Sequence, residues 1–192
     1  MSFKEAFIEI YEREITREGS TKLLDYIKSS DFFDAPASTK FHLARKGGLC
    51  EHSLNVYYRL KELVEREKAE WSERITPETV AICGLLHDLC KIDLYAVDYR
   101  NQKQPDGSWE KVPYYTTDEK LPYGHGEKSV YIINGFMRLT REEALAINWH
   151  MGSFDERNRS GGYTMSTAYS KFPFCALVHA ADLLATYLDE SD

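Results

Sequence analysis

The stretch Leu85-Leu86-His87-Asp88-Leu89-Cys90-Lys91 places a histidine and an aspartate side by side in a run that is otherwise apolar from Val80 onward. Burying an unpaired carboxylate is costly, so such a residue is normally paired or bound to a metal. Neighbouring side chains on a helix lie about 100° apart, so His87 and Asp88 could both reach one point above the same face. A core histidine that donates a hydrogen bond to the aspartate is the simpler explanation of the dipeptide taken alone.

Four other segments offer a histidine or an aspartate in a comparable setting. They are apolar helical stretches or a glycine-flanked turn, and their candidate ligands are His52, His125, His150 and Asp182. Each of these residues alone has a simpler structural explanation. Together with His87 and Asp88 they form a set of imidazoles and carboxylates that suits iron, manganese, zinc, cobalt or nickel.

The order of these residues along the chain resembles that of the HD-domain superfamily of metal-dependent phosphohydrolases. The likeness is carried by residues 46–53, 85–91, 124–126 and 178–182, within a span of about 38–188. It is closest to the HD domain of bacterial 3′-to-5′ exoribonucleases and of related phage and plasmid proteins. The exoribonucleases resemble the chain only in their HD domain.

The resemblance implies a divalent metal cofactor, with two ions expected, which could be manganese, iron, nickel, cobalt, zinc or magnesium. The minimal signature corresponds to His52, His87, Asp88 and Asp182. Its dinuclear members hold a second ion, here through His125, His150 and the shared Asp88. With a single ion, these two histidines would instead contact phosphate or serve as acid–base groups.

The expected reaction is hydrolysis of a phosphoester of a nucleotide or short oligonucleotide by a metal-activated water. Asp88 would bridge the metals or orient the water, and His179 would orient the Asp182 carboxylate from one helical turn away. Lys91 is expected to reach a phosphate, although a lysine extending from the helix to the surface explains it equally well. Further candidates for phosphate contacts flank the site segments and are otherwise ordinary surface residues: Arg45, Lys46, Arg157 and Arg159.

Two other functions use the same ligands. One is an HD-type oxygenase with a di-iron site, and the other is a non-catalytic nucleotide-binding module that retains metal. Iron with visible absorption would favour the oxygenase, whereas colourless protein with manganese, nickel or magnesium would favour hydrolysis.

Helical periodicity predicts an all-α chain, which the resemblance implies is an HD-domain helical bundle, and the length predicts a single domain over residues 1–192. The expected helices cover about 3–18, 20–27, 48–68, 126–137, 140–150 and 173–188, and a further helix begins at Thr76-Pro77 and carries His87 and Asp88. The turn signal at residues 105–108 predicts a β-hairpin insertion near 99–122, interpreted as a flap over the site or as a structural protrusion. Residues 152–170 are expected to form a second mobile loop.

Charge and cysteine content limit the partners. The net charge of −7 disfavours long nucleic acid, so we expect a small nucleotide or short oligonucleotide as partner. No apolar run is long enough for a membrane span. The four cysteines lack CxxC spacing and are expected to be reduced core residues of a cytoplasmic protein: Cys50, Cys83, Cys90 and Cys175.

Overall fold

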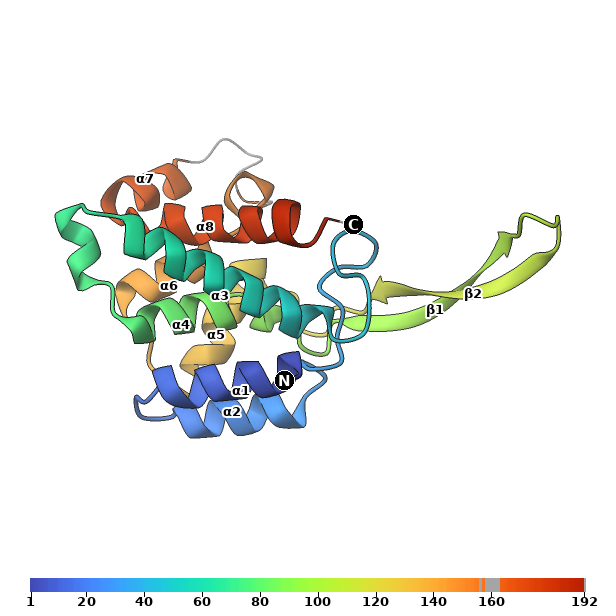
Figure 1. Ribbon diagram of the computed structural model, residues 1–192, viewed down its shortest axis with the longest axis horizontal. Coiled ribbons are helices and arrows are strands. Elements are labelled where there is room, and N and C mark those ends of the chain that lie inside the picture. Colours follow the sequence, from blue (N-terminus) through green and yellow to red (C-terminus); the bar gives the residue numbers. More distant parts are fainter. Residues whose placement is uncertain (156, 158–162, 192) are drawn as a thin grey trace.

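The computed structural model describes residues 1–155, 157 and 163–191, and it is a mostly helical bundle with one long β-hairpin (Figure 1). The α-helices are α1 (Phe3–Glu14), α2 (Ser20–Ser29), α3 (Gly48–Arg66), α4 (Pro77–Leu86), α5 (His125–Asn134), α6 (Arg141–Asn148), α7 (Thr164–Lys171) and α8 (Phe174–Leu184). Short helical segments are η1 (Glu70–Arg74), η2 (Leu89–Lys91), η3 (Gly152–Phe154) and the π-helical η5 (Ala185–Asp189), and the strands are β1 (Tyr95–Lys103) and β2 (Trp109–Thr117). None of the helices in the described ranges is long and apolar enough to cross a membrane.

The helix starts follow from local sequence. The Thr76 side chain accepts from the backbone N–H of Thr79, with Pro77 in the first turn. Thr140 and Glu143 form the predicted capping box of α6. The end of α1 comes earlier than expected, because the N–H groups of Thr16 and Arg17 donate to the Glu78 carboxylate instead of continuing the helix.

The core surrounds α3, which packs against α1, α4 and α8. Its largest buried side chains include Phe7, Phe32, Leu49, Leu60, Ile82, Leu86 and Phe174. Predicted metal ligands lie on α3 and α8 and directly after α4, so the same packing that buries the core brings these ligands together.

Two helix crossings depend on glycine. A Cβ atom at Gly84 of α4 would lie 2.6 Å from the Tyr57 Cα of α3. At the α5–α6 crossing, a Cβ at Gly126 would lie 2.4 Å from the carbonyl oxygen of Asn148. Real Cβ contacts are not this short, so each helix pair packs at a distance that only glycine permits.

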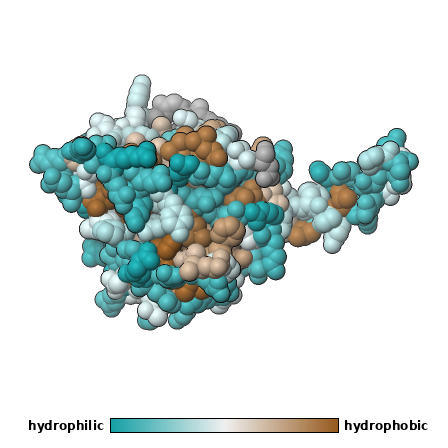
Figure 2. Space-filling model, in the orientation of Figure 1, coloured by the Kyte–Doolittle hydropathy of each residue, from teal (hydrophilic) through white to brown (hydrophobic). Residues whose placement is uncertain are grey.

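The hairpin is an arm rather than a flap. It pairs from Tyr95↔Thr117 at its base to Lys103↔Trp109 near its tip. The hairpin therefore begins and ends a few residues earlier in the chain than the predicted range of 99–122. The arm extends away from the helices (Figure 1), and its surface is mostly hydrophilic with isolated apolar residues (Figure 2). At the base, the Tyr95 hydroxyl donates to the Ala37 carbonyl, whereas Trp109 is 69% exposed. The flap interpretation is therefore wrong for the outer half of the arm.

Residues 152–170 are not the continuous loop that was expected. They contain η3 and most of α7, whose Ala168 is buried and whose Tyr169 hydroxyl donates to the Trp149 carbonyl. Helix α7 was not predicted because the glycines and serines of this segment interrupt the helical spacing that Ala168 and Tyr169 make with neighbouring apolar residues. The helical parts of the segment therefore pack on the bundle.

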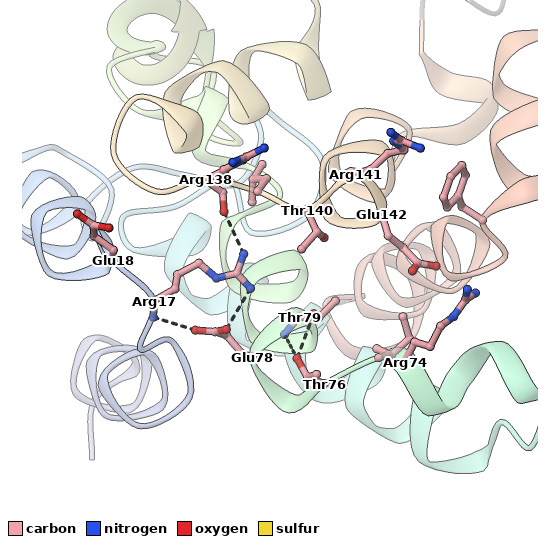
Figure 3. A pocket seen from close by; sticks show the side chains of 13 residues that line it. Arg17, Glu18, Arg74, Thr76, Glu78, Thr79, Arg138, Thr140, Arg141 and Glu142 are labelled. Carbon is pink, nitrogen blue, oxygen red and sulfur yellow. Dashed lines mark hydrogen bonds and ion pairs between the residues drawn. The ribbon is translucent and has the colours of Figure 1, made fainter.

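Arg17 connects helices at the end of the bundle where α4 and α6 begin, beside a cavity of about 930 Å³ (Figure 3). Its guanidinium lies 2.8 and 2.9 Å from the two carboxylate oxygens of Glu143 and 3.1 Å from Glu78. The Glu143 side chain is fully buried, so Arg17 balances its charge.

We expect Arg17→Met to lower the free energy of unfolding by about 3 kcal/mol, because it leaves the buried carboxylate of Glu143 without its cation. Urea denaturation measures the effect. The control is Arg13→Met, which removes an exposed pair with Glu14 and should cost less than about 1 kcal/mol. Equal losses in the two variants would contradict the role assigned to Arg17.

Candidate metal centre

All six histidines of the chain lie in one connected cluster. The six predicted ligands come from the start of α3, the turn after α4, the start of α5, the turn after α6 and the later part of α8: His52, His87, Asp88, His125, His150 and Asp182. The helix that was predicted to carry His87 and Asp88 ends before them, since α4 ends at Leu86 and a short 3₁₀ segment begins at Leu89. The His87-Asp88 pair therefore occupies the junction between two helical segments.

Asp88 lies at the centre of the cluster and faces different histidines with its two oxygens. Its Oδ1 is 2.8 Å from His125 Nε2 and 3.5 Å from His150 Nε2. Its Oδ2 is 3.6 Å from His52 Nε2 and 3.5 Å from His87 Nε2. This is the placement required of a carboxylate shared by two ions.

Hydrogen bonds fix the orientation of the imidazole rings. His87 Nδ1 donates to the Gly84 carbonyl at 2.9 Å, and His150 Nδ1 donates to the Ile147 carbonyl at 2.6 Å. A carbonyl can only accept, so the neutral rings carry their proton on Nδ1 and direct the Nε2 lone pair inward. Within the described residues, His150 Nε2 is buried without a hydrogen-bond partner. Such an inward lone pair beside carboxylates fits a divalent metal.

The charge states also suit metal binding. Burial lowers the pKa of His87 to about 3, so this ring is neutral. Burial alone would raise the pKa of Asp88, but the Lys91 ammonium and the hydrogen bond with His125 hold it well below its ordinary range, so this carboxylate is ionised. A neutral imidazole and an ionised carboxylate are the forms that bind metal without first releasing a proton.

His52 differs from His87 because two carboxylates face it. Burial opposes a charge on this ring, but Asp182 at 3.3 Å and Glu190 at 3.0 Å raise the pKa of His52 to about 9. A metal at Nε2 would take the place of this proton, so metal binding at His52 should weaken as the pH falls.

Three residues beside the ligands were missed by the sequence reasoning. The ring centroid of His42 is 5.0 Å from that of His52, and Glu190 accepts from His52 Nδ1 and from Asn55 Nδ2. Cys90 Sγ lies 3.5 Å from His125. His42 belongs to a segment without periodicity and Glu190 follows the last helical turn, so only the residue types signalled them.

The predicted phosphate-binding residues are placed unevenly. Lys91 Nζ lies 2.6 Å from Asp88 Oδ2, inside the cluster. Arg45 pairs with Glu51, and Lys46 pairs with Asp34. Arg159 lies outside the described residues.

Two further side chains have structural contacts. Arg157 binds Asp155 and Glu127 and lies 4.1 Å over the Trp149 ring, so it ties this segment to α5 and α6. His179 contacts the His150 carbonyl at 2.6 Å instead of orienting Asp182, which corrects the expectation for that residue.

Glu190 should tune the metal affinity through His52. We expect Glu190→Gln to weaken binding of a divalent metal about 10–100-fold, because the ring loses the carboxylate that makes it more basic. Competition with a chromogenic chelator measures the dissociation constant. The matched control is Asp189→Asn, which removes only an exposed pair with Arg59. Equal affinities in both variants would show that the Glu190 contact has no effect on the metal.

Comparison with protein-family models matches the HD domain over residues 49–187, which is well over half of the chain. Comparison with curated proteins and with solved structures found no match. The matched range begins just before His52 and ends just after Asp182, so it contains all six predicted ligands. The chain belongs to the HD-domain family.

Proposed function

We propose that the protein is a metal-dependent phosphohydrolase that cleaves a phosphoester of a nucleotide or short oligonucleotide. The observation that carries the proposal is the position of Asp88, whose two oxygens face two different groups of histidines. HD-domain proteins are generally metal-dependent phosphohydrolases, which supports the same class of reaction.

The metal ligands in this proposal are His52, His87, Asp88, His125, His150 and Asp182. Divalent ions held there would bind phosphoryl oxygens and lower the pKa of a bound water. Asp88 accepts hydrogen bonds as an ionised carboxylate and so can orient that water. His87, neutral and fixed by the Gly84 carbonyl, keeps its lone pair directed into the site.

Lys91 would supply a positive charge for the substrate. Burial opposes its charge, but the neighbouring Asp88 carboxylate raises the pKa of Lys91 above its ordinary value, so its amine stays protonated. Its side chain is 11% exposed, which leaves the ammonium close to the surface of the cluster. We propose that it contacts a phosphate oxygen of the substrate.

The substrate is proposed to be small. Binding of long nucleic acid depends on many phosphate contacts, each of which adds to the salt dependence. The chain is acidic overall, and Arg45, Lys46 and Arg157 are already paired with carboxylates. We therefore propose mononucleotides, dinucleotides or very short oligonucleotides, cleaved with a shallow dependence on salt. The four free, buried cysteines support the proposal of a reducing, cytoplasmic location.

A panel assay tests the function. Purified protein with added manganese is incubated with mono-, di- and cyclic nucleotides and with short RNA, and released phosphate or cleaved product is measured. The Asp88→Asn protein serves as the inactive control. No turnover of any member, combined with bound iron and visible absorption, would overturn the hydrolase in favour of the oxygenase. Processive degradation of a long single strand with a steep loss of affinity on adding salt would overturn the proposed substrate size.

A further inference from the structure

Cys90 lies within the metal centre, although its sequence context predicts only a core position. It is 2% exposed, and its Sγ is 3.5 Å from both ring nitrogens of His125 and 3.9 Å from Asp88 Oδ1. The segment η2 holds it there, with the Cys90 backbone N–H donating to Ser129 Oγ at 3.0 Å. Its position is therefore fixed by the fold.

The separations of the sulfur from its neighbours fit ligands of one metal ion, whereas the 2.8 Å between His125 Nε2 and Asp88 Oδ1 is a hydrogen bond that the ion would replace. Zinc binds sulfur at about 2.3 Å and imidazole nitrogen at about 2.0–2.1 Å, so tetrahedral ligands of these two kinds lie about 3.6 Å apart. The observed Sγ–Nε2 distance of 3.5 Å matches this value, and the 3.9 Å to Asp88 Oδ1 is close to it. As a hydrogen bond from the thiol, the second contact is long.

The other cysteines have different surroundings. Burial raises the pKa of Cys50 and of Cys175 to about 12, and it raises the pKa of Cys83 well above its ordinary value. Among the described residues, Cys90 is the cysteine that shares a potential metal-binding group with a histidine and an aspartate. The buried, unpartnered Nε2 of His150 points at the same Asp88 oxygen and independently indicates that an ion is needed here.

We propose that Cys90 is a thiolate ligand, together with Asp88 and His125, of the second metal in the centre proposed above. The inference rests on that centre. Binding would replace the thiol proton with the metal–sulfur bond and release the proton to water. Thiolate favours zinc or cobalt over manganese and magnesium, so this subsite should be selective for the softer ions.

Cobalt(II) reports directly on sulfur ligation. Metal-free protein titrated with cobalt should develop a near-ultraviolet sulfur-to-cobalt charge-transfer band. Cys90→Ser should lose this band, and its affinity for zinc at one of the two sites should fall about 100-fold or more, since loss of even an outer-shell partner costs about 10–100-fold. Cys175→Ala, which removes another buried cysteine, should keep the band.

The outcomes separate the two proposals. Absence of the band in the unaltered protein, or its persistence in Cys90→Ser, overturns the ligand role and leaves the panel assay of hydrolysis unaffected. A band that disappears in Cys90→Ser supports the ligand role whatever the panel assay shows. Failure to cleave any nucleotide in the panel counts only against the hydrolase. If circular dichroism shows that Cys90→Ser does not fold, the band is compared between the unaltered protein and Cys90→Ala, and it should be absent from Cys90→Ala.

Discussion

Asp88→Ala should release nearly all bound transition metal and lower kcat/KM by about 10³-fold or more. The carboxylate faces both groups of histidines, so its removal takes one ligand from each proposed subsite. Metal catalysis supplies several kcal/mol, and about 4 kcal/mol corresponds to about 10³-fold in rate. Metal content per protein, measured by plasma mass spectrometry, and turnover of the best panel substrate give the two readouts.

Two other variants make the Asp88 result specific. His150→Ala should retain one metal equivalent, because only the second subsite loses a ligand. Asp189→Asn, already used as a control, should retain both. Asp88→Ala leaves the Lys91 ammonium without its carboxylate and should lose some stability, so circular dichroism must first show that the variant is folded. Unchanged metal content in folded Asp88→Ala would rule out the site assignment.

Gly84→Val should lower the free energy of unfolding by about 3 kcal/mol and weaken metal binding at least tenfold. Its Cβ would lie 2.6 Å from the backbone of α3 at Tyr57, so α3 and α4 must separate. His52 and His87 lie on these two elements with their Nε2 atoms 3.3 Å apart, so the ligands separate as well. Urea denaturation and chelator competition measure the two effects.

The control for this prediction is a glycine away from any crossing. Gly107 in the hairpin turn has φ +88°, and a Cβ atom there would have no neighbour within 4 Å, so Gly107→Asn should be tolerated in both assays. If Gly84→Val unfolds at the same urea concentration as the unaltered protein, the close approach of α3 and α4 is not needed.

The parts of the fold that depend on neighbouring residues could be predicted from the sequence. Two helix starts are defined by contacts between residues only three positions apart, at Thr76 with Pro77 and in the Thr140–Glu143 capping box. The hairpin turn is defined in the same local way by residues 105–108. The six ligands could be proposed because their residue types are unusual in apolar surroundings. Whether they bind metal remains a prediction.

Features that depend on distant residues could not be predicted in this way. Helix α1 ends at Glu14 because of Glu78, more than sixty residues later. Glu190 reaches His52 across 138 positions of sequence. The direction of the hairpin arm is set by how its base packs near Ala37, whereas its turn signal specifies only strand pairing.

The inward-facing imidazoles have a consequence for the energetics of folding. The ligands come from helices that are far apart in the sequence and meet only in the folded chain, so a divalent ion that needs several of them binds the native state rather than the unfolded chain. Any ion that binds only the native state raises stability by about 1.4 kcal/mol for each tenfold excess over its dissociation constant. The thermal midpoint of the protein should therefore rise with metal concentration, and the order of midpoints across metals would rank the ions by affinity before any substrate is known.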